Sequence, residues 1–314
     1  MNLAFNVSSY RGDIPLLRGC LASIKYFAPD APICIVLDGN VNIKPLEKYY
    51  NLHVITRENT INKDLKRLSF GLGVTKMVSL WESPFDYILH VDADAVLWGD
   101  IRKNLPSREW DFIFNEPHEE ITPSIQKSQY FDPDKVFRYI EPFPWTGNPY
   151  FNSGVFACRV GSLDLDECIK LLEIRKNYGP HAFPLNDQSL LNILVFRALH
   201  SGKIKAFSSH LQSCVSVLNR SELEARFRIV EGAPLPWVKP TAIHWAGTKP
   251  YKTNTNVFSQ PMDFFRKLGM SETKSFLYQS PHYAMKFDEF ISRELPKITF
   301  KAKKFLKKLF RPAS

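Results

Sequence analysis

Two aspartates separated by one small residue, Asp92-Ala93-Asp94, directly follow an apolar run at residues 87–91. Side chains at positions i and i+2 of an extended chain point to the same side, so both carboxylates can face one cation. Magnesium and manganese prefer oxygen ligands, and they commonly bind through one or two carboxylates together with substrate phosphates. Two solvated aspartates at a strand end would give the same pattern, but the apolar run before them favours a metal site.

A second candidate segment lies far along the chain, at residues 243–251, with the sequence IHWAGTKPY. His244 offers a nitrogen ligand, Gly247 permits a close approach of the backbone to an anion, and Lys249 carries a point charge suited to phosphate. An imidazole beside two carboxylates favours Mn²⁺ over Mg²⁺. A buried histidine in an aromatic loop is the alternative interpretation, and for a lone histidine it is the commoner case.

The elements that must position these residues can be read from apolar runs and helical periodicity. Strands are expected at residues 3–8, 33–37, 52–56, 87–91 and 153–158, and helices at 13–24, 74–81 and 189–198. This alternation predicts βαβ units and a parallel or mixed sheet. Ligands of such sheets bind at the carboxyl ends of the strands, where the two aspartates fall. Residues 115–150, rich in proline and aromatics, are expected to cross over the sheet as an acceptor-side or lid segment.

The apolar strand, the D-x-D motif and the late H-x-x-G…K-P-aromatic segment together resemble the GT-A glycosyltransferases. The similarity spans roughly residues 3–251 and is greatest to the retaining family 8 members of the lipooligosaccharide galactosyltransferase and glycogenin type. It implies a Rossmann-like mixed α/β sheet flanked by helices, of the kind that binds nucleotide-diphospho-sugars.

The resemblance also implies a ligand set. In that family two aspartates and a histidine hold a manganese ion that bridges the donor diphosphate, and a glycine and a lysine contact the diphosphate. The matching residues are Asp92, Ala93, Asp94 and His244 for the metal and donor, and Gly247 and Lys249 for the diphosphate. Two features depart from the family pattern. Only Thr248 separates the glycine from the lysine, and Tyr251 stands where the family has tryptophan.

Three residues of the first half match donor-binding positions of the family. Tyr10 is expected to stack on the uracil, with Ser8 beside it where the family has acidic or amide residues. Lys76 corresponds to a basic residue that touches donor phosphate or sugar, and an ordinary surface lysine is the alternative.

The residues implied to act on the sugar come later in the chain. Asn152 matches an asparagine that contacts the donor sugar or the acceptor, although Asn-Ser-Gly is also good turn chemistry. Asp187 matches an aspartate that binds sugar hydroxyls, and Gln188 a glutamine near the anomeric carbon. Helix capping by Asn186 or Asp187 is the alternative.

The function implied is transfer of a hexose from a nucleotide-diphosphate sugar, expected to be a UDP-sugar, to a glycan or lipid-linked acceptor with retention. Two other functions stay open: an inverting transferase with Asp187 as base, and a non-catalytic carbohydrate-binding protein at a membrane surface. A sugar nucleotidyltransferase is disfavoured because residues 5–13 contain only one glycine. A two-metal phosphohydrolase is disfavoured because no second acidic cluster is evident.

Charge is concentrated at the end of the chain. The net charge is +9, and residues 297–311 carry seven lysines and arginines and no acid, which leaves +2 for the rest. This distribution argues against a broad nucleic-acid-binding surface. Apolar residues recur at helical spacing in the same segment, which is typical of an interfacial helix on an anionic membrane. A docked terminal helix or a disordered basic end is the alternative.

Domain organisation and cellular location follow as expectations. We expect a catalytic domain at residues 1–260, a helical extension at 261–296 and a basic membrane-associating tail at 297–314. The five cysteines are odd in number and show no C-x-x-C spacing, so neither a disulfide framework nor structural zinc is expected. The first ten residues lack the features of a signal peptide. A cytoplasmic protein, peripheral on the inner face of the membrane, is the resulting expectation.

Overall fold

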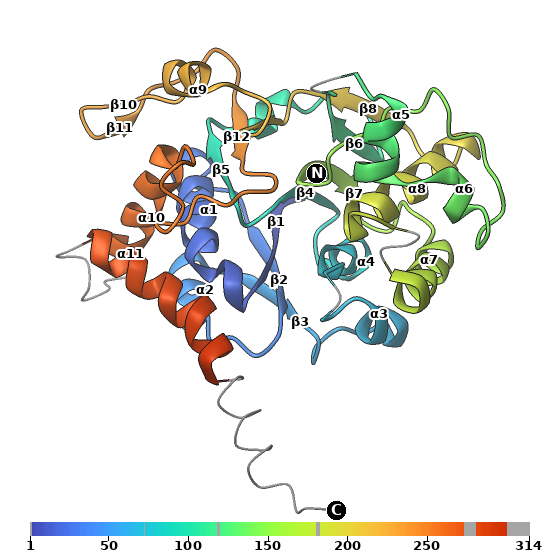
Figure 1. Ribbon diagram of the computed structural model, residues 1–314, viewed down its shortest axis with the longest axis horizontal. Helices are drawn as coiled ribbons and strands as arrows, with labels where there is room; N and C mark the ends of the chain where they lie inside the picture. Colours follow the sequence, from blue (N-terminus) through green and yellow to red (C-terminus); the bar gives the residue numbers. More distant parts are fainter. Residues whose placement is uncertain (1, 72, 118–119, 180–182, 273–280, 300–314) are drawn as a thin grey trace, which may run out of the picture.

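A computed structural model describes residues 2–71, 73–117, 120–179, 183–272 and 281–299. Its main element is a mixed sheet of seven strands in the order β3-β2-β1-β4-β7-β6-β8 (Figure 1). These strands are β3 (His53–Thr56), β2 (Ile33–Asp38), β1 (Leu3–Tyr10), β4 (Tyr87–Val91), β7 (Val155–Arg159), β6 (Phe112–Asn115) and β8 (Ala206–Ser209). The first four are mutually parallel, whereas β7 runs antiparallel to both of its neighbours.

A second sheet of three strands continues from the first. It consists of β5 (Ala95–Trp98), β12 (Thr241–His244) and β9 (Gln212–Cys214), with β12 in the centre. The chain leaves the main sheet at the end of β4 and enters the small sheet at β5, so Asp92 to Asp94 form the turn between the two sheets. The antiparallel register of β12 and β5 places His244 opposite Ala95. Strand pairing therefore brings the late histidine beside the D-x-D motif.

Helices cover both faces of the main sheet. One face carries α1 (Ile14–Phe27), which follows the 3-10 helix η1 (Arg11–Asp13), and α10 (Gln260–Glu272) packs against α1. The other face carries α7 (Leu165–Tyr178) and α8 (Asn186–His200). Short helices fill the connections: α2 (Lys44–Tyr50), α3 (Lys63–Leu68), η2 (Thr75–Val78) and α4 (Ser79–Glu82).

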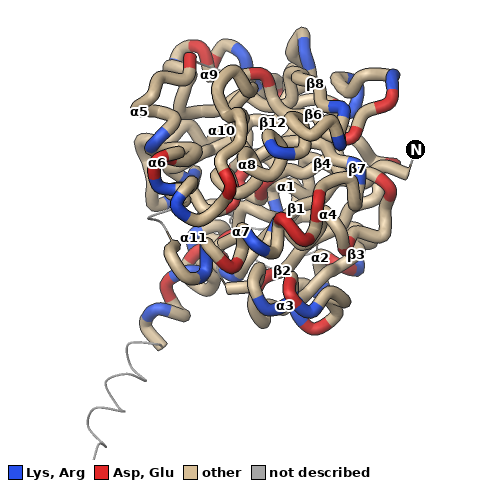
Figure 2. The backbone as a smooth tube through the Cα atoms, turned by 90° about the vertical axis from the view of Figure 1, so that its right-hand side faces the viewer, with Lys and Arg blue, Asp and Glu red and all other residues tan. Residues whose placement is uncertain are grey.

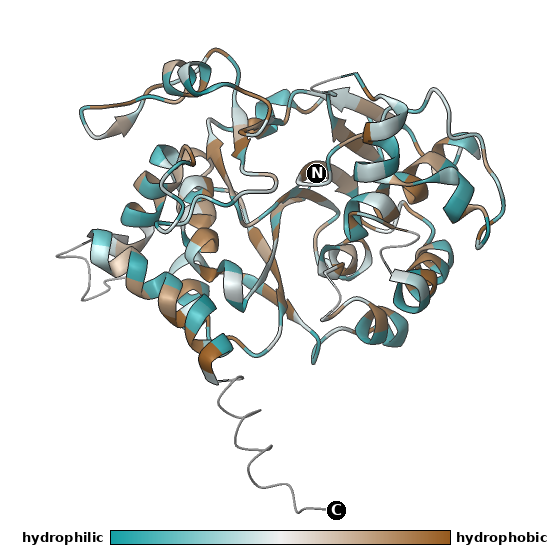
Figure 3. Ribbon diagram, viewed as in Figure 1, coloured by the Kyte–Doolittle hydropathy of each residue, from teal (hydrophilic) through white to brown (hydrophobic). Residues whose placement is uncertain are grey.

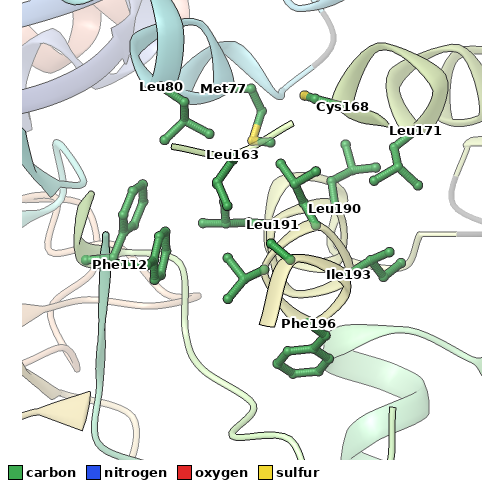
Figure 4. Packing of buried hydrophobic residues seen from close by; sticks show 14 of the residues in the cluster. Met77, Leu80, Phe112, Leu163, Cys168, Leu171, Leu190, Leu191, Ile193 and Phe196 are labelled. Atoms are coloured by element: carbon green, nitrogen blue, oxygen red, sulfur yellow. The ribbon is translucent and has the colours of Figure 1, made fainter. Parts of the chain in front are cut away.

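The strands are apolar on both faces because both faces are covered. In β4, Ile88 belongs to the core cluster that includes α8, while Leu89 and Val91 belong to the cluster that includes α1. Figure 3 shows the hydrophobic residues concentrated in these strands and in the helix faces against them. In α8, ten of the fifteen residues are buried. Figure 4 shows Leu190, Leu191, Ile193 and Phe196 of this helix packed among Met77, Leu80 and Leu171.

The element order expected from the sequence is confirmed. The strand at 87–91 has the expected bounds, and the strands near residues 3, 33 and 52 differ by two residues or fewer. The helix expected at 189–198 begins earlier, so Asp187 and Gln188 lie in its first turn. The helix expected at 74–81 is a 3-10 turn followed by a short α-helix. The helices described within residues 116–150, apart from 118–119, are all short: α5 (Pro123–Ile125), the π-helical turn η4 (Gln126–Tyr130) and α6 (Pro133–Val136).

The second half ends in three further features. The helix α9 (Arg220–Arg226) begins with a capping box and precedes a small hairpin of β10 (Ile229–Val230) and β11 (Ala233–Pro234). The last helix comprises α11 (Pro281–Glu289) and the π-helical turn η7 (Phe290–Glu294), and helical structure continues to residue 299. The remainder of the expected basic tail, residues 300–314, lies outside the described residues. None of the described helices combines the length and apolar character needed to cross a membrane.

Candidate active site

A pocket of about 560 Å³ opens at the carboxyl ends of β1, β2 and β4. This is the edge of the sheet at which ligands of open α/β folds bind. Eight sequence-predicted residues line it: Ser8, Tyr10, Lys76, Asp92, Ala93, Asp94, Asp187 and Lys249.

The two aspartates and the late histidine converge beside this pocket. One oxygen of Asp92, one oxygen of Asp94 and one nitrogen of His244 all lie within 4.8 Å of one another. His244 Nε2 is 3.6 Å from Asp94 Oδ1 and 3.8 Å from Asp92 Oδ2. Two carboxylate oxygens and an imidazole nitrogen suit a manganese or magnesium ion, with manganese favoured by the nitrogen.

The orientation of the histidine ring also fits a metal ligand. His244 Nδ1 lies 2.9 Å from Gln212 Oε1, and an amide oxygen can only accept a hydrogen bond. Nδ1 therefore carries a proton whether or not the ring is charged, and Nε2 is the nitrogen directed at the carboxylates. Gln212 in turn donates to Asn152 Oδ1 at 3.2 Å. The structure thus places Asn152 behind the histidine, two hydrogen bonds away from its imidazole ring.

Asp92 is held so that one of its oxygens faces the histidine. Its Oδ1 accepts hydrogen bonds from Lys76 Nζ at 2.8 Å and from His90 Nε2 at 2.9 Å, which leaves Oδ2 on the side of His244. Burial opposes the charged form, but Lys76 and His90 outweigh it and lower the pKa of Asp92. The carboxylate is therefore ionised, as a cation ligand must be.

Lys76 is buried, with 8% of its surface exposed, so it is no ordinary surface lysine. Its Nζ forms ion pairs with Asp92 at 2.8 Å and Asp187 at 2.6 Å, and it donates to the carbonyl of Ser153 at 3.1 Å. Burial alone would lower the pKa of Lys76, but the two carboxylates raise it. A fixed positive charge therefore stands at the floor of the pocket.

Asp187 and Gln188 are held by side-chain contacts that are not those of a helix cap, since the N-terminus of α8 has no side-chain cap hydrogen bond. Besides Lys76, Asp187 accepts a hydrogen bond from Ser153 Oγ at 3.3 Å. The amide of Gln188 accepts from the backbone of Ser153 at 3.3 Å and donates to the carbonyl of Gln129 at 2.9 Å. Gln188 therefore joins the first turn of α8 to the segment at residues 126–130.

The late loop meets the D-x-D turn through both backbone and side chain. The backbone of Trp245 donates to the carbonyl of Asp94 at 3.2 Å, and Lys249 forms an ion pair with the Asp94 carboxylate. Gly247 has φ +87°, a conformation that glycine adopts without strain, and a side chain there would meet open space. Lys249 lines the pocket and Gly247 is not among its lining residues.

At the N-terminal side, Ser8 Oγ is buried and makes no hydrogen bond with the described residues. A ligand in the pocket could satisfy this hydroxyl. The Tyr10 ring is about half exposed, at 53%, and it packs over Gly12, where a Cβ atom would come within 2.6 Å of the ring. The ring therefore presents one accessible surface beside the pocket.

Several residues of the site carry no role in the sequence prediction. His90 lies two residues before Asp92 on the same face of β4, so strand periodicity could have identified it. Gln212 and Gly154 give no such signal. A Cβ atom at Gly154 would overlap the imidazole of His244. Asp38, at the end of β2, accepts from the Gly71 backbone at 2.7 Å and from the Thr75 hydroxyl at 2.9 Å, and so fixes the far wall of the pocket.

A second pocket, of about 420 Å³, is lined in part by Asn152. Residues that line it include Glu116, Gln129, Tyr130, Tyr150, Asn152 and Ala246. Most come from the segment at 115–150, and Ala246 belongs to the late loop. Glu116 is a carboxylate of this pocket that the sequence prediction did not consider.

Solved structures show which fold this is. The galactosyltransferase LgtC, in complex with donor and acceptor sugar analogues, matches with a TM-score of 0.54 and 13% identity over 85% of this chain and 95% of LgtC. An active-site glutamine-to-glutamate mutant of LgtC matches with a TM-score of 0.52 and 12% sequence identity. The bifunctional glycosyltransferase WbbM matches with a TM-score of 0.51 and 13% sequence identity, over 90% of this chain and 51% of WbbM. No protein-family model and no curated protein matches the sequence. The chain therefore has the GT-A fold, as expected from its sequence.

Proposed function

We propose that the protein is a metal-dependent glycosyltransferase that moves a hexose from a nucleotide-diphosphate sugar, a UDP-sugar, to a glycan or lipid-linked acceptor. The observation that carries this proposal is the convergence of Asp92, Asp94 and His244 beside a pocket at the carboxyl edge of a GT-A sheet. A sugar nucleotide would fit with its base near Tyr10 and its diphosphate near the three metal ligands.

The chemistry of the pocket suits departure of a nucleoside diphosphate. As the glycosidic bond breaks, negative charge grows on the leaving phosphate. A bound divalent cation supplies Lewis-acid stabilisation of that charge. Lys249 is already directed at this place by its ion pair with Asp94, and the buried charge of Lys76 lies on the other side of Asp92. Fixed positive charges in a partly dehydrated pocket stabilise a developing anion strongly.

We infer that transfer proceeds with retention at the anomeric carbon. An inverting enzyme needs a carboxylate that is free to take a proton from the acceptor. Asp187 is instead held by Lys76 at 2.6 Å and by Ser153. Gln188, the neighbouring candidate, matches in kind the active-site glutamine exchanged in one LgtC structure. Inversion with Asp187 as base remains the alternative, and the anomeric configuration of the product by NMR distinguishes the two.

The second pocket is the acceptor side in this proposal. It adjoins the metal ligands through Asn152 and Ala246, and residues 115–150 supply most of its wall. Tyr130 and Tyr150 offer aromatic rings, against which sugar rings pack well. The carboxylate of Glu116 could accept hydrogen bonds from sugar hydroxyls.

Association with the inner face of a membrane in the cytoplasm forms the last part of the proposal. Seven basic residues and no acid occur at residues 297–311. Each basic residue near an anionic surface contributes about 1 kcal/mol. A non-catalytic carbohydrate-binding protein on the same scaffold is the competing function, and the intact set of metal ligands weighs against it.

The test is thermal stabilisation by UDP and by GDP, each with and without Mn²⁺. Ligand at about a hundred times its Kd should add roughly 2.7 kcal/mol to the free energy of unfolding. We expect UDP to stabilise the protein only with Mn²⁺, and Asp94→Asn to abolish the effect. Asp86→Asn, an exposed aspartate before β4, is the matched control. A response to GDP alone would exclude the UDP-sugar, and no response to any nucleotide with any divalent ion would refute the transferase.

A further inference from the structure

The last helix, residues 281–299, has an apolar outer face. Its buried residues are Ala284, Met285, Glu289 and Ser292, and the last three recur at steps of four and three positions. Six of the exposed residues follow the same periodicity and are large and hydrophobic: Tyr283, Phe287, Phe290, Ile291, Leu295 and Ile298, with exposed fractions between 37% and 72%. The exposed charged residues of this helix are Lys286, Glu294 and Lys297. Figure 3 shows α11 at one edge of the molecule, with hydrophobic positions among hydrophilic ones along it. No described element covers this face.

The acids of this helix are neutralised by basic partners. Asp288 pairs with Arg18 at 3.1 Å, Glu289 with the buried Arg266 at 2.6 Å, and Glu294 with Lys297 at 3.0 Å. No acid follows Glu294 in the sequence, whereas six further lysines and arginines follow Lys297. In the view of Figure 2, acidic and basic residues are interspersed over the rest of the chain. The apolar face is therefore continuous in sequence with the most basic part of the protein.

We propose that the outer face of residues 281–299 lies in the interface of an anionic membrane, so that membrane contact begins well before the basic tail. Aromatic and aliphatic side chains beside cations are the composition of interfacial helices. The apolar spacing also continues in the sequence through Ala302, Phe305 and Leu309. A second copy of the chain is a poorer occupant, because the basic segments of two copies would repel each other.

The inner face of the same helix contacts the rim of the candidate active site. The Arg293 guanidinium lies 3.6 Å from the centre of the Tyr251 ring, and the Tyr251 hydroxyl donates to the carbonyl of Gly12 at 3.2 Å. Glu289 accepts hydrogen bonds from the backbone of Lys252 at 2.9 and 3.0 Å. The membrane surface would thus lie beside the donor pocket. This inference deepens the proposed membrane association, but its test needs no transferase activity.

The experiment uses the full chain with an environment-sensitive NBD label on Phe287→Cys. All five native cysteines are buried, so a surface cysteine can be labelled selectively. Ile61→Cys, whose native side chain is 86% exposed on a different element, is the matched control. With phosphatidylglycerol-containing vesicles we expect a blue shift and a severalfold rise of NBD emission at position 287 and none at 61. With phosphatidylcholine vesicles, or in about 1 M salt where the Debye length is about 3 Å, we expect little change at either.

Three outcomes would overturn the proposal. NBD at position 287 could stay in water while the protein floats with the vesicles, which would leave the basic tail as the whole contact. Its emission could shift without vesicles as protein concentration rises, which would mean that a second copy covers the face. It could also be shifted at all protein concentrations, which would mean that a segment of the same chain covers it. As a second variant, Phe287→Ser with Ile291→Ser should reduce flotation severalfold, whereas Ile61→Ser should leave it unchanged.

Discussion

His244 is confined from two sides. Gln212 holds its Nδ1 at 2.9 Å, and Gly154 lies so close to the ring that any side chain there would overlap it. Residues that only orient a metal ligand typically change metal affinity about 10- to 100-fold when they are mutated. Gly154 therefore belongs to the metal site although it has no functional group, because it leaves room for the imidazole of His244.

Substitution of that glycine should impair the metal site. We expect Gly154→Ala to displace the imidazole and to weaken Mn²⁺ binding by about 10- to 100-fold in calorimetric titration. Gly161→Ala is the control, because Gly161 has φ +75° but no atom within 4 Å of its added Cβ. It should cost stability through backbone strain without changing Mn²⁺ affinity. Equal Mn²⁺ affinity in both variants would show that His244 is not a ligand.

A second prediction at the scale of single residues concerns Lys76. The Asp92 and Asp187 side chains that it pairs with are only 26% and 23% exposed, so their charges are poorly hydrated. We expect Lys76→Met to lower the free energy of unfolding by roughly 3–5 kcal/mol, measured by urea denaturation without metal. Added Mn²⁺ should restore part of the loss, since it returns positive charge to Asp92. Lys63→Met, at an exposed lysine of α3, should be close to neutral, and a similar result at Lys76 would contradict the assigned ion pairs.

At the scale of elements, two connections build the site. The register of β12 against β5 sets His244 opposite Ala95. The last helix then holds the loop beyond it, because Glu289 joins the fully buried Arg266 of α10 to the backbone of Lys252. This link is a buried ion pair that also satisfies a backbone donor.

Loss of the charge on Glu289 should therefore destabilise the protein. Glu289→Gln keeps the shape of the side chain but leaves Arg266 buried without a counter-ion, which we expect to cost roughly 3–5 kcal/mol in urea denaturation. Glu294→Gln in the same helix removes only a pair exposed to solvent, with 49% and 61% of the two side chains exposed. Its effect should be much smaller. Comparable losses in the two variants would mean that the buried pair contributes nothing beyond a surface one.

Stability against pH is a property of the whole molecule. Burial disfavours a charged His244, but Asp94 outweighs burial and raises its pKa from 6.5 to about 10. Burial, followed by the charge of Asp94, raises the pKa of Asp13 from 3.8 to about 7. Each group therefore retains a proton in the folded state that the unfolded chain releases at lower pH. Such a group stabilises the fold fully below its unfolded pKa and loses this contribution as pH rises through the folded pKa.

We expect the metal-free protein to lose stability as pH rises, through Asp13 between about 4 and 7 and through His244 between about 6.5 and 10. Manganese needs the neutral imidazole, so its apparent affinity should increase over the second interval with release of a proton. Urea denaturation in EDTA, and titration calorimetry in two buffers of different ionisation enthalpy, measure the two effects. His244→Asn should flatten the slope above pH 7, whereas the exposed His53→Asn should not. An unchanged slope in His244→Asn would contradict the assigned pKa.

Much of the fold and part of the metal site could be predicted from local sequence patterns. The run at residues 87–91 and the two aspartates after it were identifiable because a strand buried on both faces needs contiguous apolar residues. Side chains two positions apart share a face in any extended chain, so the pairing of Asp92 with Asp94 is also a local property. The alternation of strands and helices then indicated an α/β sheet, with its ligands at the edge where these aspartates lie.

The remaining parts of the site depend on contacts between distant segments. Asp94 and His244 meet because β5 and β12 pair in one register, and register depends on the packing of whole strands. The sequence did not show that Lys76 is buried, since its inward direction depends on how η2 and α8 pack together. Gln212 and Gly154 were not identifiable at all, because a hydrogen bond to an imidazole and the space beside its ring exist only after two strands from distant segments have come together.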